Sequence, residues 1–164
     1  MEGSGTVKAN VVKPIQGDHA FPLESDLDGF AGRFAKVLRV PLVIWLEGDL
    51  GTGKTAFARA LIHSLGYEGK VKSPTYTLLE EYQCDSLQVL HMDLYRISDP
   101  GELEFLGLVD LMDEQTILLV EWPDKGGHWL PEPDFIFRFA YVSEGRDMHW
   151  TACTALAQRI NFPT

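Results

Sequence analysis

The chain has 164 residues, of which 45% are hydrophobic and 23% charged, so it is long enough for one globular domain and too apolar for a disordered chain. Its net charge is −10 and its densest basic stretch is the pair Lys70 and Lys72, which disfavours direct high-affinity binding to tRNA or DNA. No run approaches the roughly 18 apolar residues of a membrane helix, and residues 1–10 hold no apolar signal core, which predicts a cytoplasmic protein. We expect a single domain over residues 1–164, with residues 1–20 as a candidate flexible N-terminal segment.

The first predicted elements surround a glycine-rich loop. Apolar residues at helical spacing predict a helix over residues 25–38, with Ser25 as its N-cap. The apolar run 42–46 is typical of a buried strand. The glycine-rich loop comes next and leads into a second amphipathic helix, which ends at Gly66. The segment therefore predicts a strand, a loop and a helix in direct succession.

The middle of the chain predicts a hairpin and a third helix. Residues 75–82 and 87–92 are expected to form two strands joined by a tight turn. Residues 99–112 predict a helix that is opened by Ser98 or Asp99, because a proline follows in the first turn.

The last third predicts three more strands. Residues 116–120 form a short buried strand, and alternation over residues 135–142 predicts an edge-like strand. A turn at Gly145-Arg146 then returns residues 148–154 antiparallel. Because strands and helices alternate, we expect an α/β fold of three layers, with parallel central strands and antiparallel flanking strands.

One loop carries the strongest chemical signal, since Gly48–Thr55 satisfies the spacing G-x-x-x-x-G-K-[ST] of a phosphate-binding loop. Its inner glycines allow backbone N–H groups to turn around phosphate oxygens, Lys54 can reach the β- and γ-phosphates, and the Thr55 hydroxyl can bind Mg²⁺. A chance glycine-rich turn is the alternative, but the loop lies between a predicted strand and a helix, as a P-loop requires. The candidate nucleotide-binding residues here are Gly48, Asp49, Leu50, Gly51, Thr52, Gly53, Lys54, Thr55 and Ala56.

Two acids and a threonine complete the candidate site. Asp93 and Glu121 each follow a predicted strand, and ligands of parallel sheets gather at the carboxyl ends of strands. Either acid could orient the metal or the attacking water; the alternatives are a turn cap for Asp93 and a solvated loop acid for Glu121. Thr75 lies 21 residues after Lys54, where nucleotide switches place a threonine that senses the γ-phosphate. An ordinary strand-entry turn is the other interpretation of Thr75.

Other side chains near these positions are open to more than one interpretation. Trp122 could stack on a base, mark a partner surface or belong to the core. His91 is interpreted as a structural strand histidine rather than a general base, and Arg96 as either a phosphate ligand or part of an ion pair. The two cysteines, Cys84 and Cys153, have no metal-ligand spacing and are expected to be small buried residues.

Five motifs occur in a fixed order and together resemble the bacterial ATPase family TsaE, formerly YjeE, of the tRNA threonylcarbamoyladenosine pathway. The resemblance extends over roughly residues 22–146 and rests on Gly48–Thr55, Ser73–Leu78, His91–Arg96, Glu102–Gly107 and Val120–Pro123. It implies an ATPase that binds the TsaB–TsaD pair and resets it between turnovers. That pair transfers a threonylcarbamoyl group to N6 of adenosine 37, so tRNA would be met only through the complex.

The resemblance also implies roles for individual residues. Lys54 and Thr55 would bind phosphate and Mg²⁺, Thr75 would be the switch threonine, and Asp93 and Glu121 would be acids at the metal. Trp122 belongs to the same family signature, and the segment around Glu24 and the Gly145-Arg146 turn would close over the nucleoside. The first helix departs from the family pattern, since Leu27 and Ala31 stand where a threonine and a glycine are usual, and this weakens the role of Glu24.

The expected reaction is in-line attack of water on the γ-phosphorus of Mg·ATP. The loop holds no arginine, so an arginine finger would come from elsewhere in the chain or from a partner. The alternatives are a small-molecule P-loop kinase, a GTP-dependent switch, disfavoured because the Asn-Lys-x-Asp motif is absent from the sequence, and a binding module that holds nucleotide without hydrolysing it.

Overall fold

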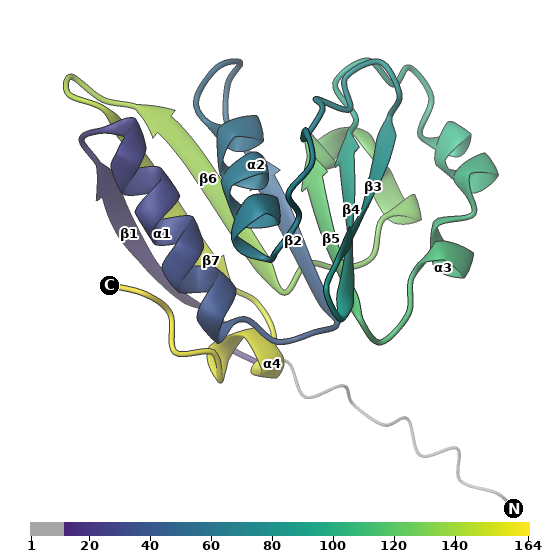
Figure 1. Cartoon of the computed structure of the whole chain (residues 1–164). Helices are drawn as coiled ribbons and strands as arrows, with labels where there is room; N and C mark the ends of the chain where they lie inside the picture. Colours follow the sequence, from purple (N-terminus) through teal and green to yellow (C-terminus); the bar gives the residue numbers. More distant parts are fainter. Residues whose placement is uncertain (1–11) are drawn as a thin grey trace, which may run out of the picture.

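A mixed sheet runs through the centre of the protein, whose computed structural model describes residues 12–164 (Figure 1). Within these residues seven strands form one sheet in the order β1-β7-β6-β2-β5-β4-β3. The strands are β1 (Ile15–Phe21), β2 (Leu42–Glu47), β3 (Leu79–Cys84), β4 (Leu87–Asp93), β5 (Thr116–Glu121), β6 (Phe135–Tyr141) and β7 (Arg146–Ala152). The helical elements are α1 (Glu24–Val37), α2 (Lys54–Ser64), the 3-10 helices η1 (Pro100–Leu106), η2 (Pro123–Lys125) and η3 (Gly127–Trp129), and the short helices α3 (Leu108–Leu111) and α4 (Ala155–Gln158).

The direction of the strands confirms the expected α/β P-loop NTPase fold. The central strand β2 pairs in parallel with β5 on one side and with β6 on the other, and β5 pairs in parallel with β4. The flanking pairs β1–β7, β7–β6 and β3–β4 are antiparallel. Because β2, β5 and β4 are parallel neighbours, their carboxyl ends meet at one edge of the sheet.

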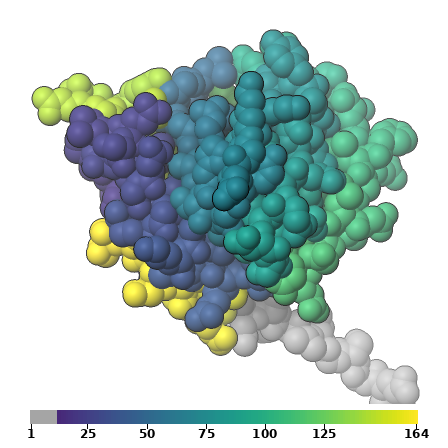
Figure 2. Space-filling model, viewed as in Figure 1, coloured from purple at the N-terminus to yellow at the C-terminus, as the bar shows by residue number. Residues whose placement is uncertain are grey.

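Helices α1 and α2 pack side by side on one face of the sheet (Figure 1). Phe30 and Phe34 of α1 and Phe57 of α2 are fully buried against Phe137 of the sheet, with ring centroids 5.3 to 6.5 Å apart. Burying each such side chain contributes about 1.5–3 kcal/mol to folding. In the space-filling view, α1 (purple to blue) lies directly against the blue segment that contains α2 (Figure 2). The start of α2 is thereby held against the sheet.

The opposite face is covered by shorter elements. Leu103 of η1, Leu108 of α3 and Leu130 pack with Leu118 of β5 in a second, separate core cluster. The sheet therefore lies between two helical layers, as expected for three layers. The long helix predicted over residues 99–112 is wrong in detail, because η1 and α3 are separated at Gly107, whose φ is 63°.

Several predicted boundaries differ from the structure. Ser25 lies inside α1, not at its cap; the N-cap is Leu23, whose backbone N–H donates to the Asp26 carboxylate at 2.8 Å. The N-cap at Asp99 is confirmed, since its carboxylate accepts from the Gly101 N–H at 2.9 Å. The strand expected from Thr75 begins only at Leu79.

The flanks of the sheet differ more. Residues 135–142 were predicted as an edge-like strand, but β6 lies between β2 and β7 and is not an edge. The antiparallel return is confirmed by β7, but the turn before it includes Gly145 and not Arg146, which is already the first residue of β7 and pairs with Tyr141. Of the candidate flexible segment 1–20, residues 1–11 lie outside the described part of the chain, and residues 15–20 belong to β1. Within residues 12–164 no helix is both long and apolar enough to span a bilayer.

Candidate functional site

The phosphate-loop sequence connects β2 to α2 at the carboxyl edge of the sheet. Gly53 is the N-cap of α2 and has a left-handed φ of 118°, a conformation that other residues adopt only with strain. A Cβ at this position would lie 2.8 Å from a guanidinium nitrogen of Arg146. Because the first N–H groups of a helix have no intrahelical acceptor, the loop ends in free donors with a positive dipole behind them. This is the local geometry of an anion site.

Lys54 is buried and bridges the loop. Its side chain is only 4% exposed, and its ammonium donates to the carbonyls of Gly48 at 2.5 Å and Asp49 at 2.7 Å. The ammonium also lies 4.4 Å from the ring centroid of Trp122. Burial lowers the pKa of Lys54, and the nearby carboxylates of Glu121 and Asp93 oppose that change.

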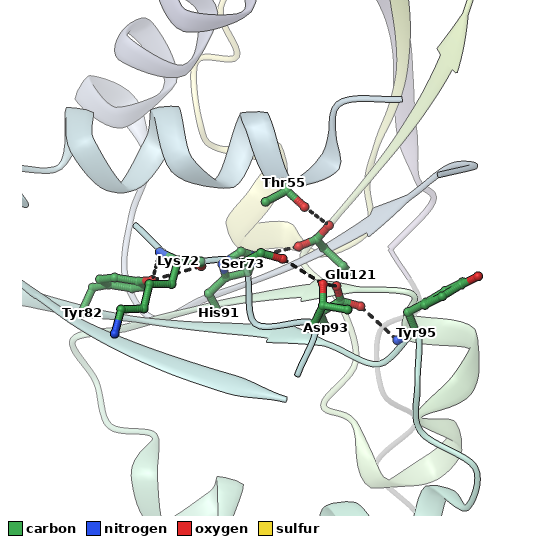
Figure 3. A network of polar contacts seen from close by, with 9 residues as sticks. Thr55, Lys72, Ser73, Tyr82, His91, Asp93, Tyr95 and Glu121 are labelled. Atoms are coloured by element: carbon green, nitrogen blue, oxygen red, sulfur yellow. Dashed lines mark hydrogen bonds and ion pairs between the residues drawn. The ribbon is translucent and has the colours of Figure 1, made fainter. Parts of the chain in front are cut away.

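Two hydroxyl–carboxylate pairs line the site, and Figure 3 labels Thr55, Glu121 and Asp93 among their members. The Thr55 hydroxyl donates to Oε1 of Glu121 at 2.7 Å, and the Thr75 hydroxyl donates to Oδ2 of Asp93 at 2.9 Å. Asp93 and Glu121 are direct register partners on β4 and β5, and both are at most 5% exposed. Glu121 is therefore not a solvated loop acid. Asp93 also accepts from the Tyr95 N–H at 2.9 Å. It therefore caps the backbone with one carboxylate oxygen and binds the Thr75 hydroxyl with the other.

These groups line a cavity of about 350 Å³, which brings most of the predicted site residues together. Its volume lies within the range of small-molecule sites. The lining residues are Leu50, Gly51, Gly53, Lys54, Thr55, Ala56, Thr75, Asp93, Tyr95, Arg96, Glu121, Trp122 and Arg146.

The remaining predicted residues lie around this cavity rather than in its lining. Gly48 and Asp49 supply the carbonyls that Lys54 contacts, and the Thr52 hydroxyl donates to the Asp49 carbonyl at 2.8 Å. Glu24 and Gly145 line a neighbouring cavity of about 250 Å³, which they share with Arg146. Arg146 thus lines both cavities.

A family model described as "Threonylcarbamoyl adenosine biosynthesis protein TsaE" matches residues 22–148. The chain belongs to the TsaE family. It is 40% identical over 144 residues to the tRNA threonylcarbamoyladenosine biosynthesis protein TsaE of Haemophilus influenzae, covering 85% of this chain and 91% of that protein. It is also 40% identical over 107 residues to the Aquifex aeolicus TsaE, covering 63% of this chain and 75% of the relative. The crystal structure of Bacillus subtilis YdiB superposes with a TM-score of 0.68 at 26% identity, covering 92% of this chain and 93% of that one.

Membership of the TsaE family places the protein in tRNA threonylcarbamoyladenosine biosynthesis. The family match begins at residue 22 and ends at residue 148, so it includes the loop, both acids and the Gly145-Arg146 turn. Strand β1 and helix α4 lie outside the matched range.

Two residues of this TsaE-family site, Tyr95 and Tyr141, had no role assigned from the sequence, and His91 was interpreted only as a structural strand histidine. Tyr95 lines the cavity, and its ring centroid lies 5.1 Å from that of Trp122. The hydroxyl of Tyr141 donates to the Gly51 carbonyl, which fastens the loop to β6. His91 is buried against Glu121. The Tyr95 and His91 positions lie inside the motif His91–Arg96 and could have been suspected from it, but Tyr141 follows the loop by 90 residues with no local signal.

The donor atoms suit a hard cation. Thr55, Asp93 and Glu121 offer only oxygen, the ligand type that Mg²⁺ prefers. Across residues 12–164 no group of three or more His, Cys, Asp or Glu side chains is arranged to hold a metal. Mg²⁺ at nucleotide sites commonly takes one or two carboxylates together with phosphate oxygens and water, so the set at this edge of the sheet fits it.

Proposed function

We propose that this protein binds Mg·ATP in the cavity in front of Gly48–Thr55 and hydrolyses it. In this proposal the ATPase serves tRNA N6-threonylcarbamoyladenosine modification at adenosine 37 by acting on the TsaB–TsaD pair and resetting it between turnovers. Membership of a family of threonylcarbamoyladenosine biosynthesis proteins supports the pathway. The protein would meet tRNA only through that complex, in the cytoplasm, and its net charge of −10 agrees with the lack of direct tRNA binding.

One observation carries the ATPase proposal. A loop with P-loop spacing and a buried lysine faces two carboxylates, each already hydrogen-bonded to a threonine hydroxyl, across a single cavity. A lysine, a P-loop hydroxyl and strand-end carboxylates are the parts that P-loop nucleotidases use. A chance glycine-rich turn would not bring these groups together from β2, β4 and β5.

The residues would divide the work as follows. The backbone N–H groups at the start of α2 would bind phosphate oxygens, and Lys54 would exchange its contacts with Gly48 and Asp49 for the β- and γ-phosphates. Thr55, with Glu121 or Asp93, would hold Mg²⁺, which when bound supplies positive charge to the phosphate oxygens. Thr75 with Asp93 would orient the attacking water beside the γ-phosphate. Trp122, Arg146, Gly145 and Glu24 would close over the nucleoside.

Hydrolysis by the isolated protein should be slow. Two arginines line the cavity, but Arg96 stacks on Tyr76, with its guanidinium carbon 4.5 Å from the ring centroid, and Arg146 lies against Gly53. P-loop proteins that lack an arginine finger hydrolyse nucleotide at about 10⁻⁴ s⁻¹, and supplying that arginine accelerates hydrolysis by about 10³–10⁵. We therefore expect stimulation when the TsaB–TsaD pair binds.

The test is phosphate release by the purified protein, with and without the TsaB–TsaD pair and with and without Mg²⁺. The proposal expects Mg²⁺-dependent release that rises with the pair and disappears in Lys54→Ala. Equal rates with and without the pair would refute the stimulation. Transfer of the γ-phosphate to an added small molecule would favour a kinase, and ATP binding without release in either condition would favour a non-hydrolysing module.

A further inference from the structure

The carboxylate of Glu121 is held from both sides (Figure 3). Its Oε1 accepts from the Thr55 hydroxyl at 2.7 Å, and its Oε2 lies 2.8 Å from Nε2 of His91. His91 is fully buried on β4, and Glu121 is only 2% exposed. A carboxylate only accepts hydrogen bonds, so with Glu121 ionised the proton in the second contact belongs to Nε2 of His91.

We propose that His91 is a positioning residue for Glu121: its Nε2–H fixes the carboxylate so that Oε1 is presented to Thr55 and the cavity. This inference rests on the proposed Mg·ATP site, because it assigns Glu121 a task there. The cavity lining, as far as the described residues show, includes Glu121 but not His91. His91 would therefore act through Glu121 and would not touch nucleotide or metal.

The geometry argues for this role over simple packing. The second ring nitrogen of His91, Nδ1, is buried and has no hydrogen-bond partner within residues 12–164. Burying an unpaired polar atom is unfavourable, so an apolar residue of similar size would serve the core better if packing were the only requirement. The contact that distinguishes histidine from such a residue is the one to Glu121. Held at one oxygen only, the long glutamate side chain could rotate about its remaining bonds.

The sheet explains how the contact arises. On β4, His91 and Asp93 point to the same face, because side chains two residues apart share a face. Asp93 is paired in register with Glu121, and His91 with Leu119, so His91 is the diagonal neighbour of Glu121. A histidine ring is long enough to cover this diagonal. One strand thus supplies both an acid for the site and the donor that orients the acid of the next strand.

The experiment compares ADP affinity in the presence of Mg²⁺ and in EDTA for wild type, His91→Leu, His91→Gln and His91→Asn. Partners of metal-site groups typically contribute 10–100-fold to metal affinity. We expect His91→Leu to reduce the Mg²⁺ enhancement of ADP affinity by about 10-fold or more, with affinity in EDTA nearly unchanged. His91→Gln, which keeps an N–H donor at similar reach, should recover most of it. His91→Asn, one methylene shorter, should not.

Val89→Ala is the matched control. Val89 is fully buried on the same strand and the same face, and its register partner is Ile117, not Glu121. Its truncation therefore removes packing and leaves the contact between His91 and Glu121 in place. It should lower the melting temperature and keep the Mg²⁺ enhancement. If His91→Leu does not fold, the comparison of His91→Gln with His91→Asn decides the matter. Equal Mg²⁺ enhancement in these two variants and wild type would overturn the positioning role.

A second readout needs no ligand. In ¹⁵N-histidine NMR spectra of the ligand-free protein, His91 should carry its proton on Nε2, and Glu121→Ala should shift that signal. A proton on Nδ1 alone would overturn the inference. A wild-type protein that binds no nucleotide at all would instead refute the proposed function, so the two failures can be told apart.

Discussion

The ammonium of Lys54 lies over the indole of Trp122, 4.4 Å from the ring centroid, while it donates to two carbonyls of its own loop. Trp122 adopts a left-handed φ of 57°, which a bulky residue tolerates only when its surroundings demand it. The lysine cannot keep all these contacts and also reach a γ-phosphate. Nucleotide binding should therefore change the environment of Trp122.

The first prediction follows from this relationship. Adding ATP should change the tryptophan fluorescence of the wild-type protein, because the cation leaves the ring face and the nucleotide approaches it. Trp122→Phe should lose that change while still binding ATP in a calorimetric titration. The other three tryptophans, Trp45, Trp129 and Trp150, do not line the cavity, as the described residues define it, and provide a constant background. A full fluorescence response in Trp122→Phe would contradict the prediction.

Gly53→Ala should destroy nucleotide binding and destabilise the protein. An alanine at a φ of 118° is strained, and its Cβ would lie 2.8 Å from a guanidinium nitrogen of Arg146. Strain of this kind costs about 1–3 kcal/mol, which urea unfolding would detect.

Gly32→Ala is the control for this prediction. Gly32 lies within α1, and a Cβ there would meet only the Ser64 hydroxyl at 3.8 Å, an ordinary contact. This substitution should stabilise the protein by about 0.5–1 kcal/mol and leave ATP affinity unchanged. Loss of binding in both variants, or in neither, would contradict the assignment of the loop.

The loop and the two acids could be predicted because their signals are local. The spacing in Gly48–Thr55 and the apolar runs before it are contained in adjacent residues. Asp93 and Glu121 follow buried runs directly, and parallel strands end at the same edge whatever their order. The sequence therefore predicted which residues gather there.

Which threonine contacts which acid could not be predicted, because it depends on the order of strands. Thr55 contacts Glu121 because β5, not β4, is the neighbour of β2. Strand β1 was missed for a different reason: its sequence, IQGDHAF, is mostly exposed and shows little apolar alternation. It becomes a strand by pairing with β7, a contact between the two ends of the chain. That pairing makes β1, and not β7, the strand at this edge of the sheet.

Thr75→Ala should slow ATP hydrolysis and leave ADP affinity nearly unchanged. The Thr75 hydroxyl contacts Asp93 at 2.9 Å and lines the cavity, so its loss should lower the rate of phosphate release, by about 10-fold or more if it positions water or the γ-phosphate. ADP affinity should change little, because ADP lacks the group that Thr75 would sense.

The control for Thr75 is two residues away. Thr77 makes an equivalent hydroxyl contact, 2.9 Å to Glu80, but on the exposed surface. Thr77→Ala should keep the wild-type rate of phosphate release. A Thr75→Ala variant that releases phosphate at the wild-type rate, or that loses ADP and ATP affinity equally, would refute the switch role.

The last prediction concerns pH and the free thiol of Cys84. Burial raises the pKa of Cys84 from 9.0 to about 11, and the neighbouring carboxylate of Asp85 acts in the same direction. Between these values the folded protein keeps a proton that the unfolded chain releases. The stabilisation is thus fully present below pH 9 and is lost as the pH rises toward about 11. A shift of this size sets an upper limit of about 3 kcal/mol on the loss.

Burial lowers the pKa of Lys54, so its deprotonation has the opposite effect on stability as the pH rises. The pH dependence of wild-type stability is therefore ambiguous when taken alone. The comparison with Cys84→Ala isolates the thiol. Urea unfolding at pH 8 and near pH 10.5 should show that wild type loses more stability than the variant does, even though the variant is less stable at pH 8 because of the cavity it creates. Cys84 is fully buried in the core cluster beneath α2. Equal losses of stability in the two proteins would contradict the prediction, because they would mean that the Cys84 thiol reaches water in the folded state.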